Sequence, residues 1–248
     1  MAGTAVLGRL NWLAAKVTHI RPETERVRSI FFECPGWDGH LAGQHVDVRL
    51  TAEDGYQAQR SYSIASAPED DHLVLTVERL QDGEVSPYLA DVLHTSDQLE
   101  MRGPIGRYFV WERSMGGPLL LIAGGSGVVP FRSVLRHRVA SQVEVPTRLL
   151  YSSRSFDDVI YQEELAALAA YDEIDIRFTL TRSQPAGWKG YGRRIDHELL
   201  EQVSWKPKER PLIYICGPTS FVETAAGALV DLGHDPALIR TERFGPTG

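Results

Sequence analysis

Cysteine is scarce in this chain: only Cys34 and Cys216 occur among its 248 residues. Two distant thiols cannot ligate an iron–sulfur cluster, which needs more thiolates, and they do not form the framework of a disulfide-rich domain. The eight histidines show neither HExxH nor HxxEH spacing, so the sequence predicts no metal site.

Long hydrophobic runs and an excess of positive charge are also missing. No apolar run approaches the roughly 18 residues of a membrane span, and the N-terminal segment MAGTAVLGRLNWLAAKV lacks the basic start and cleavage site of a signal peptide. Lys and Arg number 26 against 33 Asp and Glu, a net charge of −7 that argues against nucleic-acid binding. We therefore expect a cytoplasmic monomer that binds neither nucleic acid nor membranes.

The first half of the chain has the pattern of an antiparallel β-domain. Short segments rich in Val, Ile, Leu and Tyr are separated by turn residues such as Glu53-Asp54-Gly55, which is typical of a barrel or a sandwich. The expected strands are residues 10–19, 27–34, 44–50, 59–64, 72–79 and 97–102. A short helix is expected over residues 86–93, with Ser86 as its N-cap and Pro87 in its first turn.

The second half changes to an alternation of strands and helices. The continuous apolar run Pro118–Ala123 is typical of a strand covered on both faces, and the alternation predicts a doubly wound parallel sheet. We expect strands at 118–123, 148–151, 174–180, 212–216 and 237–244, and helices after Pro130 and over 158–170, 196–202 and 219–232. Glycines before Pro118 indicate a linker, so the predicted domains are residues 1–114 and 115–248.

A glycine-rich turn, Gly124–Pro130, follows the first strand of this second half. Glycines at a strand-to-helix turn let backbone N–H groups approach a phosphate, and the helix N-terminus adds partial positive charge. The turn departs from G-x-G-x-x-G because Pro130 holds the third position, and a tight turn without a ligand is the alternative. Its likeness to the hydrolase elbow G-x-S-x-G fails at Val128, and no His–Asp pair is evident for Ser126, so we exclude a hydrolase.

Basic residues follow the next strands where a dinucleotide fold would carry an acid. Ser153 and Arg154 end the second parallel strand, Arg182 ends the third, and Arg193 follows in the stretch GRRI. Hydroxyl and guanidinium groups suit the 2′-phosphate of NADPH, so the sequence favours NADPH over NADH. The alternative is that these arginines are solvated surface charges.

Five motifs in order give the chain a specific resemblance: Arg60–Ser63 (RSYS), Gly83–Ser86 (GEVS), Gly125–Pro130 (GSGVVP), Cys216–Pro218 (CGP) and Glu242–Phe244 (ERF). The chain resembles the ferredoxin–NADP⁺ reductase family, which includes flavohaemoglobin reductase domains and oxygenase reductase components, here without an iron–sulfur domain. The resemblance implies a six-stranded antiparallel Greek-key barrel that binds flavin, followed by an α/β domain that binds NAD(P).

The resemblance also implies roles for individual residues. Arg60 would bind the flavin diphosphate, Tyr62 would pack on the isoalloxazine, and Ser63 would hydrogen-bond flavin N5. Side chains alternate along a strand, so we expect a twist or bulge that brings these three to one ligand. The implied catalytic residues are Ser63, Cys216, Glu242 and Phe244. The implied cofactor-binding residues are Arg60, Tyr62, Ser63, Val77, Gly83, Val85, Ser86, Gly125, Ser126, Gly127, Val128, Pro130, Ser153, Arg154, Arg182, Arg193, Gly217, Pro218 and Phe244.

The function implied is a flavin-dependent NAD(P)H oxidoreductase. Hydride would pass from NADPH, rather than NADH, to N5 of FAD, rather than FMN, and electrons would go on to an external acceptor such as a ferredoxin or another small redox protein. Two alternatives stay open: an NAD(P)H:flavin reductase that uses free flavin as a substrate, and a non-catalytic flavin-binding redox sensor.

Overall fold

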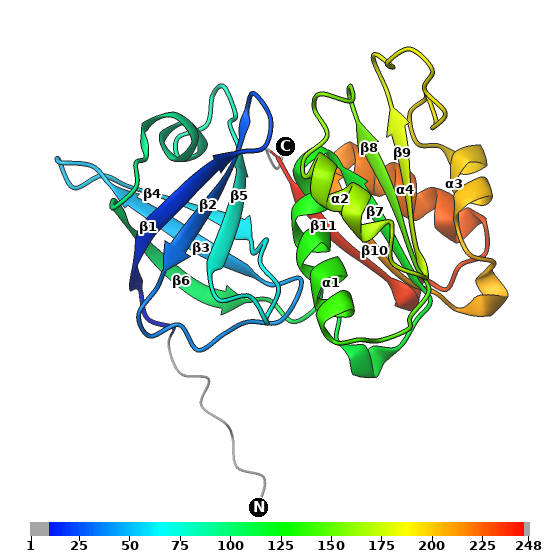
Figure 1. The fold of residues 1–248 in the computed structure, drawn as a ribbon, viewed down its shortest axis with the longest axis horizontal. Helices are drawn as coiled ribbons and strands as arrows, with labels where there is room; N and C mark the ends of the chain where they lie inside the picture. The colour runs from blue at the N-terminus through cyan, green and yellow to red at the C-terminus, as the bar shows by residue number, and fades with distance from the viewer. Residues whose placement is uncertain (1–9, 246–248) are drawn as a thin grey trace, which may run out of the picture.

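A computed structural model describes residues 10–245 of the protein. The first half forms a six-stranded antiparallel barrel, seen beside the second half in Figure 1. Its sheet has the order β4-β3-β6-β1-β2-β5, and a bridge between Ile64 and Leu75 joins the two ends. The strands are β1 (Leu13–Pro22), β2 (Val27–Glu33), β3 (His45–Thr51), β4 (Gln57–Ser63), β5 (Leu73–Glu78) and β6 (Gln98–Ile105).

The barrel is filled by the apolar side chains that alternate along its strands. Val46 and Val48 of β3, like Ala15 and Val17 of β1, are fully buried in one apolar cluster. Residues that alternate along a strand point to the same face, so the apolar alternation seen in the sequence becomes the barrel core. A short helix at Tyr88–Val92 buries Leu89 in this cluster.

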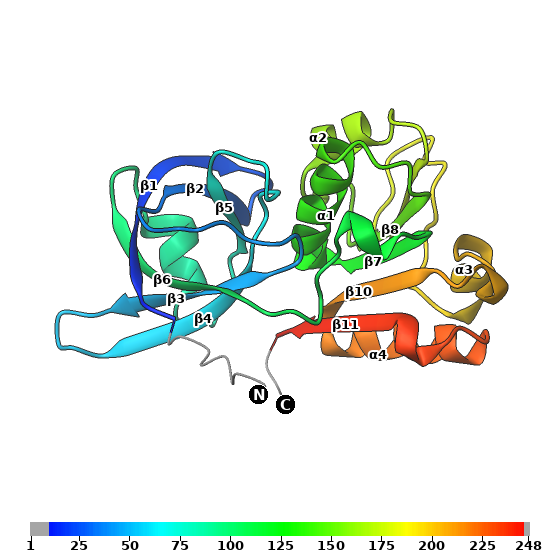
Figure 2. The same ribbon diagram turned by 90° about the horizontal axis from the view of Figure 1, so that it is seen from below.

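The second half is a five-stranded parallel sheet of order β11-β10-β7-β8-β9. Helices α1 and α2 cover one face, and α3 and α4 cover the other (Figure 2). The strands are β7 (Leu119–Gly124), β8 (Thr147–Ser153), β9 (Ile174–Leu180), β10 (Leu212–Pro218) and β11 (Ile239–Phe244). The helices are α1 (Val129–Ala140), α2 (Gln162–Leu168), α3 (His197–Val203) and α4 (Thr219–Asp231).

The apolar run in β7 is explained by this double covering. Leu119 and Leu121 belong to the cluster beneath α1, whereas Leu120 and Ile122 belong to the cluster beneath α3 and α4. All four are fully buried. The chain leaves β7 toward β8 on one side and returns to β10 on the other, so the β7/β10 boundary is the switch point at which such sheets bind ligands.

The two halves pack through a polar network between α1 and the loop 65–70 of the barrel. Arg132, which is 5% exposed, donates from Nη1 to the carbonyl of Ala65 at 2.9 Å, and the Ser133 hydroxyl donates to the carbonyl of Ser66 at 2.6 Å. Arg136 forms an ion pair with Asp70. These contacts fix the carboxyl edge of the parallel sheet against the barrel.

The connection 106–118 joins the two halves along the interface between them, which is called the seam below. Trp111 is fully buried within it and donates from Nε1 to the carbonyl of Gly116 at 3.0 Å. The predicted domain boundary between residues 114 and 115 falls inside this connection and stays a prediction. Within residues 10–245 no helix combines the length and the hydrophobicity that a membrane crossing requires.

Two expectations about local structure need correction: of the twist or bulge expected at RSYS, the bulge is absent, and one predicted helix is shorter than expected. The register of β3 with β4 runs without a shift from His45↔Ser63 to Thr51↔Gln57, so β4 has no bulge at its RSYS sequence. The irregularity lies in the pairing of β3 with β6, between His45 and Asp47. The predicted helix over 158–170 shortens to α2, because Tyr161 has a left-handed φ of 62° directly before it.

Candidate functional site

The carboxyl edge of the parallel sheet brings together side chains that lie far apart in the sequence. Cys216 of β10 pairs in register with Glu242 of β11, and Pro218 pairs with Phe244. The Cys216 sulfur lies 4.0 Å from Oε2 of Glu242. Three of the four predicted catalytic residues therefore occupy one corner of the second domain.

His45 connects this corner to the barrel, and sequence reasoning missed it. It pairs across the strands with Ser63, and its Nδ1 lies 3.8 Å from Oε1 of Glu242. Residues that pair directly across two strands point to the same face, so Ser63 and His45 both face the second domain. The sequence gives only a weak signal that His45 is a site residue, because this depends on which residue of β3 lies opposite Ser63.

Burial alters the ionisation of the groups at this corner. Burial raises the pKa of Glu242 to about 7, so its carboxyl group can hold or release a proton near neutral pH. Burial raises the pKa of the Cys216 thiol well above its usual value, and the nearby Glu242 raises it further. The thiol therefore stays protonated, and Cys216 is suited to packing and weak hydrogen bonding rather than to nucleophilic attack.

Burial also lowers the pKa of His45, although Asp47 opposes the shift. A neutral imidazole beside a carboxyl group that titrates near pH 7 can exchange a proton with it. His45 and Glu242 thus place two titratable groups 3.8 Å apart across the seam between the two domains.

The glycine-rich turn is shaped by close backbone contact with β10. A Cβ atom on Gly127 would lie 2.0 Å from the carbonyl oxygen of Cys216, and one on Gly124 would lie 2.9 Å from the ring of Phe221. Gly125 has a φ of +55°, which glycine adopts without strain. Only glycine lets this turn pass so close to the Cys216–Pro218 segment. The residues Gly125–Val128 form a 3-10 turn directly before α1, and the first backbone N–H groups of such a turn have no partner within it and can receive an anion.

Three other residues predicted in this turn have defined surroundings. Pro130 lies in the first turn of α1, and Val128 is fully buried. The Ser126 hydroxyl donates to Oε2 of Glu78 on β5, at 2.8 Å. The turn therefore contacts the barrel directly, and the Ser126 hydroxyl must share or exchange this partner if it binds a phosphate.

Two of the predicted 2′-phosphate ligands lie side by side at the ends of β8 and β9. The backbone N–H of Arg182 donates to the carbonyl of Arg154 at 2.8 Å. Both side chains are exposed, and neither guanidinium bonds to another residue in the range 10–245. Ser153 beside them is buried.

Arg193 is differently placed. Its guanidinium pairs with Asp196 and, at 2.9 Å, with Glu198. A nucleotide phosphate would have to compete with these carboxylates, so Arg154 and Arg182 are the better candidates for the 2′-phosphate site.

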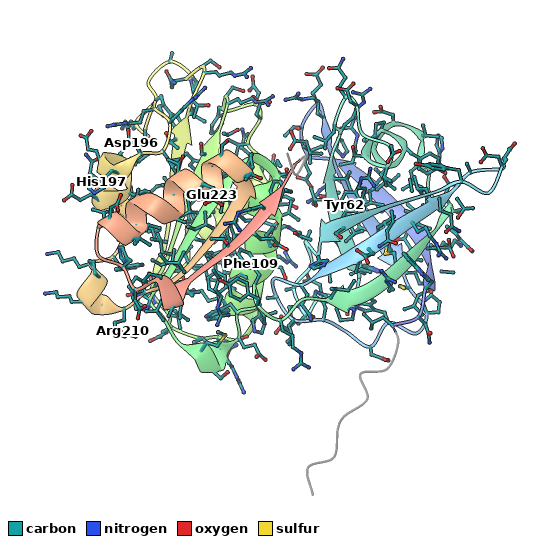
Figure 3. The ribbon with its side chains drawn as sticks, turned by 180° about the vertical axis from the view of Figure 1, so that it is seen from behind. Tyr62, Phe109, Asp196, His197, Arg210 and Glu223 are labelled. Atoms are coloured by element: carbon teal, nitrogen blue, oxygen red, sulfur yellow. The ribbon has the colours of Figure 1, made fainter. Side chains whose placement is uncertain are left out.

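On the barrel, Arg60 and Tyr62 lie on the same face of β4. Tyr62 packs against the barrel core, and burial raises the pKa of its hydroxyl; Figure 3 shows it on the barrel side of the molecule. Arg60 is exposed and pairs with Glu84. Ser61 points to the other face, where its hydroxyl donates to Asp47 at 2.7 Å.

The GEVS segment leads from the turn Leu80–Gly83 into the short helix expected from residue 86, but Ser86 is not the side-chain cap we expected. The Ser86 hydroxyl accepts from the backbone N–H of Leu80 at 3.1 Å and caps no helical N–H. A Cβ atom on Gly83 would lie 2.7 Å from this hydroxyl. Val85 and Val77 are fully buried, so only their backbone atoms are available to a cofactor.

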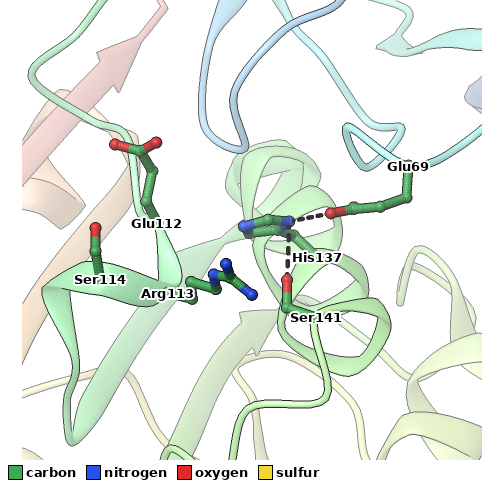
Figure 4. Close-up of a pocket in the computed structure, with 6 residues that line it drawn as sticks. All are labelled: Glu69, Glu112, Arg113, Ser114, His137 and Ser141. Atoms are coloured by element: carbon green, nitrogen blue, oxygen red, sulfur yellow. Dashed lines mark hydrogen bonds and ion pairs between the residues drawn. The ribbon is translucent and has the colours of Figure 1, made fainter.

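A polar hollow of about 330 Å³ lies elsewhere (Figure 4). It is lined by Glu69, Glu112, Arg113, Ser114, His137 and Ser141. His137 and Ser141 belong to the C-terminal end of α1, whereas the predicted site residues cluster around its N-terminal end. The hollow is therefore separate from the candidate site.

Comparisons with known proteins identify the family and the fold of this chain. Two family models match, the oxidoreductase FAD-binding domain over residues 15–110 and the oxidoreductase NAD-binding domain over residues 121–227. Ferredoxin--NADP reductase B of Sorangium cellulosum (strain So ce56) is 33% identical over 241 residues, which is 93% of this chain and 96% of that protein.

A second relative is longer than this chain. The glycine betaine monooxygenase reductase subunit of Pseudomonas aeruginosa (strain UCBPP-PA14) is 30% identical over 208 residues, which is 83% of this chain and 56% of that protein. Among solved structures, the FAD/NAD-binding domain of nitric oxide dioxygenase from Vibrio cholerae O1 biovar El Tor superposes with a TM-score of 0.83 at 25% identity. That superposition covers 94% of this chain and 99% of the other.

Proposed function

Because this chain belongs to the ferredoxin–NADP reductase family, we propose that it is an FAD-dependent oxidoreductase that takes electrons from NADPH and passes them to an external redox protein. The observation that carries this proposal is the seam itself. The end of β4 in the barrel and the ends of β10 and β11 in the second domain are joined there by the 3.8 Å approach of His45 to Glu242.

The residues present fit both nucleotides. Arg60 is an exposed cation on the face of β4 that also carries Tyr62. The glycine turn is close-packed on β10 and leaves helix N–H groups for a diphosphate. Bound here, FAD would accept hydride from NADPH at the seam and release electrons to the partner.

The chain's own residues would position the reactants and manage protons. Ser63, at the end of β4, would hold the reacting edge of the flavin, and Phe244 would cover its face until nicotinamide enters. Glu242 and His45 would hold the proton that the reaction takes up or releases. Catalysis of this kind rests mainly on orientation, since well-placed reactants gain several orders of magnitude in rate.

NADPH is favoured over NADH by Arg154 and Arg182, two adjacent guanidinium groups that no carboxylate in residues 10–245 neutralises. The acceptor must be external to this sequence because its two cysteines cannot hold an iron–sulfur cluster. Two relatives are named a ferredoxin–NADP reductase and a monooxygenase reductase subunit, and a small redox protein is the proposed acceptor.

Retention of flavin and turnover together test the proposal. The FAD-loaded protein should keep about one FAD per chain through gel filtration and should reduce an artificial electron acceptor when NADPH is added. The Ser63→Ala variant should keep FAD and bind NADP⁺ normally, yet turn over about 10- to 100-fold more slowly, because a positioned hydrogen bond to the reacting edge is lost.

Other outcomes identify the alternatives. Loss of FAD on gel filtration together with NADPH-dependent reduction of added flavin would indicate a free-flavin reductase. A protein that keeps FAD but reduces nothing with NADPH or NADH would be a redox sensor, and the proposed activity would be wrong.

A further inference from the structure

The two arginines proposed for the 2′-phosphate lie on two neighbouring segments of the chain. Arg154 directly follows β8, and Arg182 opens a loop, residues 182–190, that extends past the end of β9 (yellow in Figure 1). Besides the bond between these two backbones, the N–H of Ser183 donates to the carbonyl of Arg154 at 3.2 Å. Both bonds lie at the start of the loop, so its other residues must be fixed by other contacts.

Trp188 fixes this loop on the domain core. It is half-buried, whereas every other residue from 182 to 190 is exposed. Its ring packs against Phe156, with 5.8 Å between ring centroids, and against Phe178 of β9, at 6.4 Å. Phe156 lies two residues after Arg154, so the contact of Phe156 with Trp188 joins the segment of one arginine to the loop of the other.

The loop is shaped to hold this ring. The indole N–H of Trp188 donates to the carbonyl of Tyr191 at 3.0 Å, and the backbone N–H of Tyr191 donates to the carbonyl of Phe178 at 3.0 Å. A Cβ atom on Gly190 would lie 2.5 Å from the indole ring and 2.9 Å from the Phe178 carbonyl oxygen. Glycine at position 190 therefore lets the loop close over the ring and return to β9.

A fixed loop matters for the binding of a phosphate. The guanidinium groups of Arg154 and Arg182 are exposed and have no partner in residues 10–245, so their spacing is set by the backbones that carry them. Two guanidinium groups held at one spacing can bind the same phosphate together. Groups whose backbones move independently bind it more weakly, because ordering them costs conformational entropy.

We propose that Trp188 is a positioning residue for the 2′-phosphate of NADPH. It holds the loop 182–190 against the Arg154 segment and so gives the protein its preference for NADPH over NADH. This inference rests on the proposed function, because it names the residue that makes the nucleotide site selective. NADH has a hydroxyl in place of that phosphate, so its binding gains nothing from two spaced guanidinium groups. Trp188 acts through Arg182 and not by touching the nucleotide.

Titrations of the FAD-loaded protein with NADP⁺ and NAD⁺, together with steady-state kinetics, test this role. Trp188→Ala should weaken NADP⁺ binding and raise KM for NADPH by about 3- to 30-fold, as expected for partial loss of charge-assisted contacts. Its kcat and its NAD⁺ binding should stay nearly unchanged. Trp188→Phe should keep most of the preference, because a smaller aromatic ring can still pack on Phe156.

A double-mutant cycle tests whether Trp188 acts through Arg182. In the Arg182→Ala background, Trp188→Ala should have little further effect on NADP⁺ binding, because the group that it positions is gone. Gly190→Ala should displace the indole ring without removing it, and so reproduce the effect of Trp188→Ala. Gly192→Ala is its matched control, because the added methyl group would meet the side chain of Gln184 at an ordinary 3.4 Å.

Trp205→Ala separates positioning from general loss of stability. Trp205 belongs to the same domain, and its Nε1 donates to the carbonyl of Leu119 at 3.1 Å, at the opposite end of the sheet. This variant should lower the unfolding midpoint and leave the ratio of NADP⁺ to NAD⁺ affinity unchanged.

Three results would overturn this role and leave the oxidoreductase function intact. They are unchanged NADP⁺ affinity in Trp188→Ala, equal losses of NADP⁺ and NAD⁺ affinity, and an undiminished effect in the Arg182→Ala background. A wild-type protein that binds NADP⁺ no more tightly than NAD⁺ would remove the 2′-phosphate site and the role of Trp188 with it. A protein that binds neither nucleotide would contradict the proposed function itself.

Discussion

Single residues at the seam owe their properties to groups that the sequence does not place beside them. The sequence motifs named Ser63, Cys216 and Glu242, and the structure puts Cys216 and Glu242 within 4.0 Å of each other. His45 was not predicted as a site residue, because its nearness to Glu242 follows from the β3–β4 register and from domain packing. A sequence motif gives residue types along the chain. The seam, in contrast, depends on residues that are distant in the sequence and adjacent in the fold.

The raised pKa of Glu242 predicts a pH dependence of stability. Its folded pKa of about 7 lies above the ordinary value of 4.5, so between these values the folded protein holds a proton that the unfolded chain releases. Folding stability should therefore fall as pH rises from about 4.5 to 7. Glu242→Gln should remove this slope and gain about 1–3 kcal/mol over the wild type at pH 8.

Urea unfolding of both proteins, stripped of flavin, at several pH values from 4.5 to 8 measures this difference. Parallel stability curves for the wild type and the Gln variant would mean that Glu242 ionises normally in the folded protein.

Arg154 predicts the nucleotide preference. Its exposed guanidinium stands beside Arg182 with no carboxylate partner in residues 10–245, and one charge-assisted contact to a phosphate is worth about 1.5–3 kcal/mol. Arg154→Ala should raise KM for NADPH by roughly tenfold or more and leave KM for NADH nearly unchanged. Steady-state kinetics with both nucleotides check this, and an equal effect on the two would remove Arg154 from the 2′-phosphate site.

At the scale of strands and helices, the sequence predicted element types well and their limits less well. The strand expected over residues 10–19 runs from Leu13 to Pro22 in the structure. Its end is set by hydrogen bonds to β2 that no local pattern records. Of the twist or bulge expected in β4, the bulge is absent, because β3 pairs with β4 in an unbroken register. Strand limits and register follow from partners, while apolar alternation follows from the strand itself.

The glycine turn gives a prediction at this scale. Gly127→Ala would place a methyl group 2.0 Å from the carbonyl oxygen of Cys216, so the turn must move away from β10. We expect a loss of about 1–3 kcal/mol in stability and weaker NADPH binding.

Gly227→Ala is the control for this substitution. Gly227 lies inside α4, where the added methyl group would meet no atom within 4 Å beyond the neighbouring residues and the backbone of its own helix. It should raise stability by about 0.5–1 kcal/mol, because alanine favours the helix. Chemical unfolding and NADP⁺ titration of both variants give the comparison, and similar behaviour would show that the close contact at Gly127 is unimportant.

For the whole molecule, the packing of the two domains was beyond sequence reasoning. The motifs predicted a barrel followed by a parallel sheet, and both were confirmed. The network that joins α1 to the loop 65–70 carries no motif, since Arg132 looks in the sequence like any arginine of an exposed helix. In the structure it is buried, with Glu164 and the carbonyl of Ala65 as partners.

Arg132→Ala should therefore weaken the seam. It leaves the carbonyl of Ala65 without this donor and removes one of the two arginines that pair with Glu164, at a cost of about 3 kcal/mol. Arg79→Ala removes an exposed pair with Asp91 and should cost less than about 1 kcal/mol. Unfolding midpoints of the two variants measure the contrast, and equal losses would show that the buried network does not hold the domains together.

The measurement that tests the account most directly is anaerobic mixing of the FAD-loaded protein with NADPH, followed by the visible absorption of the flavin. If each domain presents its nucleotide to the other at the seam, one equivalent of NADPH should bleach the flavin within about a second, in keeping with ordinary enzyme turnover. A flavin that stays bound and fully oxidised in excess NADPH and NADH would contradict the account.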